Sequence, residues 1–570
     1  DPSRHEGALA PVVGVHNIQT LGANREHPAQ ANGGGWTYNH QPMMAYWNGK
    51  FYMHFLSDPA EEHVPPSRTL MQVSEDGYNW SQPQILFPEY DVPAGFKKAK
   101  YQPKPELQYP DVYKQKPLKA IMHQRVGWYV SKGGILLATG NYGVALDRKD
   151  DPNDGNGIGR VVREVKKDGS LGPIYFIYYN HGFNEKNTAY PNYKKASKAV
   201  RAACEEILAN PRYRMQWVEE ADRDDKLIPL NNGYKAYCDY TLPDGRIVSL
   251  WKHALTSLSL DGGNTYTTTN RALGFVNSNA KIWGQRLTDG SYATVYNPSE
   301  YRWPLGISLS GDGLEYKTLN LICGEVPPMR YGGNYKSRGP QYVRGIQEGN
   351  GIPKDSDMWV SYSMNKEDIW VAHVPVPVKT VATAHADDDF AQYQKLGDLK
   401  TWNIYSPLMA PVSLRQEWLE LKDEDPFDYA CVERKIPSSS YLKASFDVQA
   451  AQTRNGSLQI EFLDEKGIAC TRIELNKEGM IRVKNGARYG NVMPYQADQT
   501  YRFEATLDTQ HRQLNLTVSI LDAEGKTLQS KSTRRIFFAP VHQIERIRFR
   551  TGDLRTFPTI DTPADWFGTL

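Results

Sequence analysis

The stretch MMAYWNGKFYMHF, residues 43–55, decides the fold, because an Asn-Gly pair separates two runs of strand-forming residues. This arrangement is the strongest short-range sign of a β-hairpin. A second turn, SEDGYNW at residues 74–80, follows downstream. The pair of turns returns twice, and Asp261 and Asp312 of the later second turns are 51 residues apart. Two hairpins in 40–50 residues are typical of a four-stranded propeller blade.

The repeat predicts an all-β protein whose residues 1–380 form a propeller of about seven blades. Residues 88–117, rich in Pro, Tyr and Lys, are expected to form a long surface loop. Residues 193–225 contain good helix formers and are expected to form a helical insertion. Alternating apolar and polar runs with short turns then predict a C-terminal antiparallel β-sandwich over residues 385–570. This sandwich is expected to be lectin-like or to brace its neighbour.

Composition excludes several classes of function. The 570 residues carry 67 Lys+Arg and 65 Asp+Glu, a net charge of +2 that argues against a nucleic-acid binder. No apolar stretch reaches the length of a membrane span, and no leader-like segment opens the sequence. The five cysteines show no CxxC spacing, which disfavours a zinc or redox site. Aromatic residues, at 11%, suit surfaces that stack on sugar rings.

Candidate site residues lie at strand ends, where a propeller builds its site. Several motifs resemble those of bacterial seven-bladed propeller enzymes that act on L-rhamnose-α-1,4-D-glucuronate linkages, a group similar in fold to the propeller ulvan lyases. The group includes rhamnose-glucuronate lyases and α-L-rhamnosidases. The resemblance lies in residues 36–55, 124–129, 152–155, 157–164, 172–176, 283–286 and 363–370. In addition, residues 74–80 resemble the Asp-box turn of sialidase-like propellers, in which the aspartate stabilises its own hairpin.

The resemblance implies a set of site residues. His40, His63, Tyr142 and Arg160 would be the catalytic residues. Further residues would contact substrate, namely Gln41, His123, Arg125, Lys281, Arg286, Tyr335 and Arg338. Gln41 replaces a histidine that the hydrolases of the group carry, and Gln cannot act as a general acid or base.

Two chemistries and one non-catalytic role remain open. β-Elimination would use His, Tyr and Arg to neutralise the uronate, remove the C5 proton and protonate the leaving oxygen. Hydrolysis of the same bond normally needs a pair of carboxyl groups, and no convincing pair stands near these residues. A glycan-binding propeller without activity is the third possibility.

The favoured interpretation is a lyase that releases terminal rhamnose from arabinogalactan-type plant glycans in the periplasm or outside a bacterial cell. Its partner would be a rhamnose- and glucuronate-containing oligo- or polysaccharide, and no cofactor or metal is expected. Residues 151–156 faintly resemble a calcium loop but lack its closing Glu, so a tight turn is expected there instead.

Overall fold

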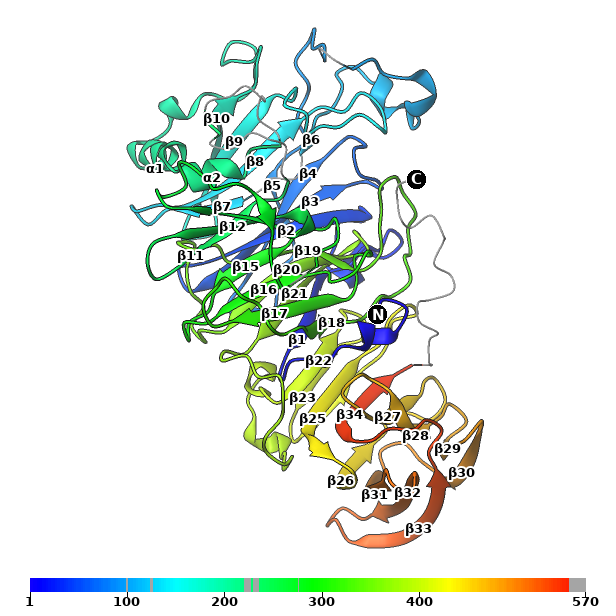
Figure 1. Cartoon of the computed structure of the whole chain (residues 1–570). Helices are drawn as coiled ribbons and strands as arrows, with labels where there is room; N and C mark the ends of the chain where they lie inside the picture. Colours follow the sequence, from blue (N-terminus) through cyan, green and yellow to red (C-terminus); the bar gives the residue numbers. More distant parts are fainter. Residues whose placement is uncertain (99–100, 123–126, 220–226, 229–234, 275, 553–570) are drawn as a thin grey trace. The chain divides into compact units, whose positions relative to one another are not determined.

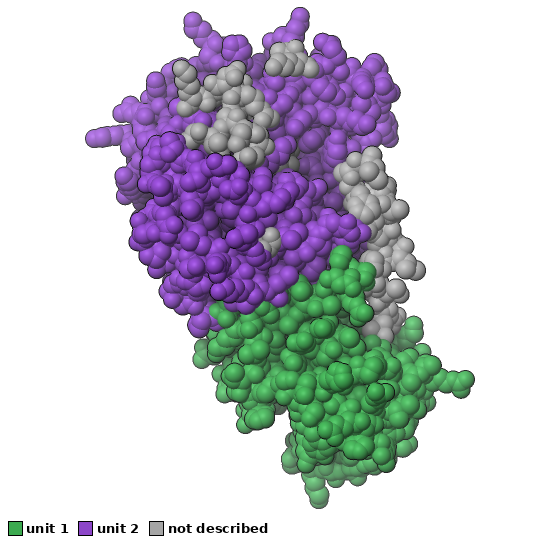
Figure 2. Space-filling model, viewed as in Figure 1, with its two compact units in different colours: residues 1–18, 320–322, 378–560 green, residues 19–319, 323–377, 561–570 purple. Residues whose placement is uncertain are grey.

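The structure is a computed structural model that describes residues 1–98, 101–122, 127–219, 227–228, 235–274 and 276–552. The chain folds into two compact units, which are coloured separately in Figure 2. The propeller unit holds Gln19–Leu319 and Cys323–Pro377. The C-terminal unit holds Asp1–Ile18, Asn320–Ile322 and the described chain from Val378 onward. The first residues of the chain are therefore part of the C-terminal unit.

The propeller unit is built from successive antiparallel meanders (Figure 1). The first has β2 (Tyr38–Trp47), β3 (Lys50–Asp58), β4 (Arg68–Ser74) and β5 (Gln84–Phe87). The second has β6 (Ile121–Met122), β7 (Gly127–Val130), β8 (Leu136–Gly143), β9 (Gly159–Val165) and β10 (Leu171–Tyr179). The third has β11 (Cys238–Thr241), β12 (Ile247–Trp251), β13 (Leu255–Ser259) and β14 (Asn270–Arg271). The others have β15 (Trp283–Arg286), β16 (Tyr292–Tyr296) and β17 (Leu305–Ser310), and β19 (Pro340–Gly345), β20 (Met358–Met364) and β21 (Asp368–Val374).

The predicted β-propeller is confirmed, together with the β-rich C-terminal domain. The described residues of the propeller unit form five meanders, against the seven blades expected from the turn spacing. Two long stretches account for the difference, since the described parts of residues 88–120 and 180–237 contain no strand. Strands β1 (His16–Leu21) and β18 (Asn320–Cys323) each contain residues of both units.

The acidic turns between strands have the structural role expected of them. Asp76 Oδ1 accepts hydrogen bonds from the backbone N–H groups of Tyr78 and Asn79, both at 2.8 Å. Asp261 closes its own turn in the same way, and hydrogen bonds led by that from the Thr265 hydroxyl lower its pKa to about 2. These carboxylates are occupied in fixing hairpins and are not free for catalysis.

The predicted helical insertion contains α1 (Lys198–Ala209) and α2 (Pro211–Met215). Ser197 caps α1 by accepting from the Val200 N–H, as a good N-cap residue does. The buried face of α1 packs with residues of β8 and β9 in one apolar cluster. Pro211 begins α2, where its missing N–H costs nothing.

Short 3₁₀ helices occupy several loops. They are η1 (His5–Ala8), η2 (Pro28–Ala31), η3 (Pro105–Leu107), η4 (Asp111–Lys114), η5 (Tyr193–Lys195), η6 (Lys252–Ala254), η7 (Phe390–Gln392) and η8 (Leu396–Asp398). Among the described residues, no helix combines the length and the apolar character needed to cross a membrane.

The C-terminal unit is a β-sandwich. One sheet contains β22 (Trp402–Ser406), β25 (Cys431–Ser439), β34 (Ile544–Thr551), β27 (Leu458–Leu463), β28 (Ala469–Leu475), β29 (Met480–Asn485) and β30 (Arg488–Pro494). The other contains β26 (Tyr441–Gln449), β31 (Thr500–Asp508), β32 (Gln513–Leu521) and β33 (Thr527–Ile536). A separate hairpin pairs β23 (Val412–Arg415) with β24 (Trp418–Leu421). Side chains such as Phe462 and Phe503, one from each sheet, fill the core between them.

The N-terminal segment completes this unit in two ways. Residues His16–Ile18 of β1 pair in parallel with β22. Glu6 enters a buried ion cluster, where Arg546 Nη1 lies 2.8 Å from Glu6 Oε2 and 3.3 Å from Glu433 Oε2. Arg548 pairs with the same two glutamates. Arg546 also donates to the carbonyl oxygens of Asp464 and Glu465, at 3.0 and 2.7 Å. Buried charges such as these depend on opposite charges and hydrogen bonds for their stabilisation.

Candidate active site

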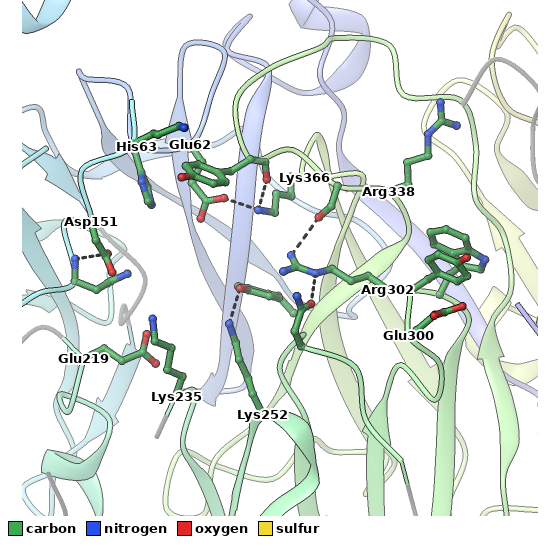
Figure 3. A pocket seen from close by; sticks show the side chains of 18 residues that line it. Glu62, His63, Asp151, Glu219, Lys235, Lys252, Glu300, Arg302, Arg338 and Lys366 are labelled. Atoms are coloured by element: carbon green, nitrogen blue, oxygen red, sulfur yellow. Dashed lines mark hydrogen bonds and ion pairs between the residues drawn. The ribbon is translucent and has the colours of Figure 1, made fainter. Parts of the chain in front are cut away.

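A pocket of about 400 Å³ lies in the propeller unit (Figure 3). Its wall comes from loops and strand ends of all five meanders, which is how a propeller builds a site from distant parts of the sequence. The lining residues are Glu62, His63, Lys149, Asp151, Asn153, Glu219, Lys235, Lys252, Asn279, Glu300, Tyr301, Arg302, Trp303, Tyr335, Ser337, Arg338, Tyr342 and Lys366. Six of these are Lys or Arg and four are Asp or Glu, so the pocket favours an anionic ligand.

Backbone strain is concentrated in this wall. His63, Tyr335, Tyr342 and Lys366 have φ values of 68°, 57°, 58° and 55°, a region that residues other than glycine rarely adopt. Tyr342 lies in β19 at a register shift between Gln341 and Arg344, which is the mark of a β-bulge. Strained residues of this kind cluster at functional sites, because the fold must hold a side chain in one required direction.

Tyr342 is surrounded by cations. Lys252 Nζ donates to its phenol oxygen at 2.9 Å and lies 4.9 Å from the ring centroid. The charged groups of Arg302 and Lys281 are each 5.1 Å from the same centroid, and that of Lys366 is 6.0 Å away. Burial alone would raise the pKa of Tyr342, but Lys252, Arg302 and Lys366 outweigh it and lower the pKa to about 7. The phenol therefore reaches its anionic form near neutral pH.

One carboxylate balances part of this positive charge. Glu62 pairs with Lys366 and is buried. Burial raises its pKa, but Lys366 together with His63 and Arg302 outweighs burial and brings the pKa to about 2, so Glu62 is ionised. Lys366 Nζ also donates to the Tyr335 carbonyl at 2.6 Å, which fixes the ammonium between the two sides of the wall.

Asp151 and His63 form another part of the wall, and Figure 3 shows both on the side away from Arg302 and Arg338. Asp151 Oδ1 accepts from the Asn153 N–H at 2.9 Å, which orients the carboxylate. Burial lowers the pKa of His63, although Glu62 and Asp151 oppose the shift. The pocket wall thus carries a carboxylate and an imidazole in addition to the phenol of Tyr342.

An aromatic pair completes the rim. The rings of Tyr301 and Trp303 stack with centroids 4.6 Å apart and planes 9° apart. Between them in the sequence, Arg302 donates to Ser337 Oγ at 3.1 Å and to Asn279 Oδ1 at 3.0 Å. Trp303 is buried and Tyr301 is half-buried, so Tyr301 supplies the exposed aromatic surface of this pair. Such a surface beside polar groups is suited to binding carbohydrate.

Three of the residues singled out in the sequence line this pocket, namely His63, Tyr335 and Arg338. His63 and Tyr335 are also neighbours, with ring centroids 5.2 Å apart.

Three others lie one layer behind Tyr342 and do not line the pocket. The His40 ring is 4.3 Å from the Tyr342 ring, and its Nδ1 is 2.5 Å from Ser363 Oγ. Gln41 accepts a 2.6 Å hydrogen bond from Lys281 Nζ, and both side chains are buried. Burial lowers the pKa of His40 strongly, so its imidazole is neutral. His40 and Lys281 thus lie near the Tyr342 ring, and Gln41 is bonded to Lys281.

The remaining residues of the predicted set lie away from the pocket wall. Tyr142 is fully buried, stacks on Tyr90 and donates its hydroxyl to the Pro88 carbonyl at 2.9 Å. Arg160 is buried with its guanidinium 5.0 Å from the Trp217 ring. Arg286 is an exposed residue of β15. His123 and Arg125 lie outside the described residues. The expected quartet of His40, His63, Tyr142 and Arg160 is therefore not assembled around this pocket.

Several pocket residues were missed from the sequence. Glu62 is next to His63 in the sequence, and Lys366 lies in the motif at residues 363–370. Both could therefore have been chosen as candidate site residues from the sequence. Asp151 belongs to residues 151–156, for which the sequence predicts a tight turn. Tyr342 and Lys252 had no local sign, because their importance depends on cations from other meanders.

Fold and pocket together define a class: a β-propeller protein with a cationic pocket, followed by a β-sandwich. Residues 1–234 match the BT_1020-like N-terminal beta propeller family, and residues 402–566 match the sialidase-like CBM domain family. A solved structure described as "Sialidase" is 64% identical, with a TM-score of 0.92 over 99% of this chain. This chain spans about half of that protein, 51% of its length. No curated protein matches.

More distant solved structures share much less. Trypanosoma rangeli sialidase in complex with sialic acid is 11% identical over 96% of this chain and 97% of its own, with a TM-score of 0.35. The Bombyx mori GH32 beta-fructofuranosidase BmSUC1 is 11% identical over 91% of this chain and 92% of its own, with a TM-score of 0.29. Scores this low support no inference about the site.

Proposed function

We propose that the protein is a glycoside hydrolase that removes a terminal acidic sugar from a glycan, with Tyr342 as the nucleophile. The observation that carries the proposal is the phenol of Tyr342, whose pKa is lowered to about 7 by Lys252, Arg302 and Lys366 despite burial. An oxygen nucleophile needs this kind of activation, because a phenol of ordinary pKa is almost fully protonated at neutral pH. The 64%-identical structure described as "Sialidase" supports the same class of reaction.

The substrate class follows from charge. Lys and Arg side chains around the nucleophile suit a sugar whose carboxylate lies beside the reacting carbon. A carboxylate nucleophile would be repelled by that group, whereas a tyrosine is the nucleophile known for sialidases. We therefore propose a ketosidically linked 2-keto sugar acid, the class to which sialic acid belongs.

The reaction would proceed in two steps. Tyr342 oxygen attacks the anomeric carbon while protonated Asp151 donates its proton to the glycosidic oxygen, which leaves as an alcohol. The Asp151 carboxylate then takes a proton from water, whose oxygen displaces Tyr342 and releases the sugar. Two displacements retain the anomeric configuration. The proposed reaction uses no cofactor.

Elimination at rhamnose-α-1,4-glucuronate is the second candidate. His63, held neutral by a lowered pKa beside Tyr335, supports it as a base for the C5 proton. The cations of the pocket would neutralise the uronate in this reaction as well. Hydrolysis of the same linkage, which also releases free rhamnose, is the alternative reaction on this substrate. For either substrate we propose a periplasmic or extracellular location and an accessory role for the sandwich in glycan binding.

One assay separates these reactions. The full chain is incubated with an α-ketoside of sialic acid and, separately, with a rhamnose-capped glucuronate oligosaccharide. Free sugar and ultraviolet absorbance are followed together. Release of the 2-keto acid without absorbance change supports the main proposal. Free rhamnose with rising absorbance supports elimination, free rhamnose alone supports an α-L-rhamnosidase, and binding without release of either sugar identifies a glycan-binding protein.

Lys252→Met is expected to move the pH dependence of kcat/KM. In the wild type, activity should rise as pH passes about 7, because the phenolate is the active form and the pKa of Tyr342 is about 7. Without Lys252 the phenolate loses its hydrogen-bonded cation, so the inflection should shift to higher pH. A spectroscopic titration of the phenolate band, taken as a difference from Tyr342→Phe, should shift in parallel. Lys149→Met removes another pocket cation and should leave the inflection in place.

A further inference from the structure

Lys98 is a buried cation that contacts the connection between β8 and β9, which forms part of the pocket wall. It belongs to the 88–117 stretch that follows β5, and its side chain is 0% exposed. A buried ammonium is costly unless its three N–H groups and its charge are satisfied. The groups around the Lys98 ammonium must therefore supply hydrogen-bond acceptors and negative charge.

Four oxygens surround the Lys98 ammonium, and all come from the connection between β8 and β9. Nζ lies 2.9 Å from the Val144 carbonyl, 2.8 Å from Asp150 Oδ1 and 2.9 Å from the Asp151 carbonyl. A fourth contact, at 3.1 Å, is with Asp154 Oδ2. The turn that resembles a calcium loop in the sequence thus holds an ammonium group among its oxygens.

The same connection carries three pocket residues, Lys149, Asp151 and Asn153. Lys98 bonds to the backbone of Asp151 itself and to the acidic residues on either side of it. Nearby contacts strengthen the link, because Tyr101 donates to Asp147 Oδ1 at 2.6 Å. The 88–117 stretch is therefore attached to the segment that presents Asp151.

We infer that Lys98 is a positioning residue that holds Asp151 in the orientation needed for proton transfer to the leaving group. The inference rests on the proposed function, because it takes Asp151 as the acid–base group. A proton donor must reach the glycosidic oxygen within hydrogen-bond distance, and a displacement of about 1 Å far from the reacting atoms is enough to cost about 10²-fold in rate.

Lys98→Met tests the inference, since it keeps the length of the side chain and removes the charge. Two substrates are compared: an alkyl ketoside of sialic acid, whose poor leaving group needs an acid, and a 4-nitrophenyl ketoside, whose leaving group does not. The expected result is a fall of about 10²-fold in kcat for the alkyl substrate with KM little changed, and a much smaller fall for the aryl substrate. Asp151→Asn should give the same pattern, and the exposed neighbour variant Lys97→Met should behave as wild type.

Equal losses on the two substrates, or no loss on either, would overturn the role of Lys98. Asp154→Asn removes only the contact between Lys98 and the partly exposed Asp154 carboxylate. It should give a smaller loss of kcat that is again greater for the alkyl than for the aryl substrate, and it tests the inference even where Lys98→Met folds poorly. Amide hydrogen exchange supplies a readout independent of activity: residues 144–154 should exchange faster in Lys98→Met than in wild type. Unchanged exchange refutes the inference, whereas a wild type inactive on both ketosides refutes the proposed function.

Discussion

Replacing Tyr342 with phenylalanine is expected to lower kcat by about 10³-fold or more while the protein stays folded, because the substitution removes only the attacking oxygen. The ring would keep its packing against His40 and its place among the cations. The measurement is release of the acidic sugar under saturating substrate. Binding of the free sugar acid, followed by calorimetry, should change much less, because the contacts proposed for its carboxylate are with Lys and Arg side chains, which the substitution leaves in place.

Tyr335→Phe is the matched control, since Tyr335 lines the same pocket and also has a left-handed backbone. It should retain most of the wild-type turnover. A Tyr342→Phe enzyme with nearly normal kcat would exclude a tyrosine nucleophile and direct attention to His63 and elimination. Trapping of a covalent sugar on Tyr342 by a slow substrate, detected by mass spectrometry, would give direct support.

Glu6→Gln is expected to destabilise the C-terminal unit by about 3–5 kcal/mol, because it leaves the buried Arg546 and Arg548 with one carboxylate in place of two. Native-state hydrogen exchange in β25 and β34 would report the loss. Asp1→Asn, at an exposed ion pair with Arg4, should have little effect. Wild-type protection in Glu6→Gln would show that Glu433 alone neutralises the cluster.

The same cluster predicts how the stability of the C-terminal unit changes with pH. Burial raises the pKa of Glu6, but Arg548 and Arg546 outweigh it and hold the pKa well below its ordinary value. A lowered pKa in the folded state means that the stabilisation is fully present above the unfolded value near 4.5 and is lost as pH falls below it. Acid should therefore weaken the C-terminal unit, and Glu6→Gln should remove part of that dependence.

Much of the fold was predictable because its determinants are local. Turn residues such as Asp76 and Asp261 bond to the backbone a few positions away, so the sequence alone marks them. The helix caps at Ser197 and Asn210 are equally local. The number of blades was less predictable, because long insertions occupy sequence length without adding strands.

The site was only partly predictable, because its chemistry depends on contacts between meanders. Arg160 follows the first residue of β9, and its side chain turns into the core. Tyr142 similarly belongs to the buried β8. Tyr342 looks like an ordinary strand residue until Lys252, Arg302 and Lys366 are seen around it. Nothing in the neighbouring sequence indicates either the bulge or the cations.

The contribution of residues 1–18 to the C-terminal unit has a consequence for synthesis. These residues leave the ribosome first among those described here, yet β22 and the strands carrying Arg546 and Arg548 emerge hundreds of residues later. The early segment must stay unpaired while the propeller unit is translated, with Glu6 solvated until its arginine partners appear. The sandwich can therefore complete this pairing only after the strand that carries Arg546 and Arg548 has been synthesised, and residues 378–552 placed on another protein would lack the segment 1–18 that completes them.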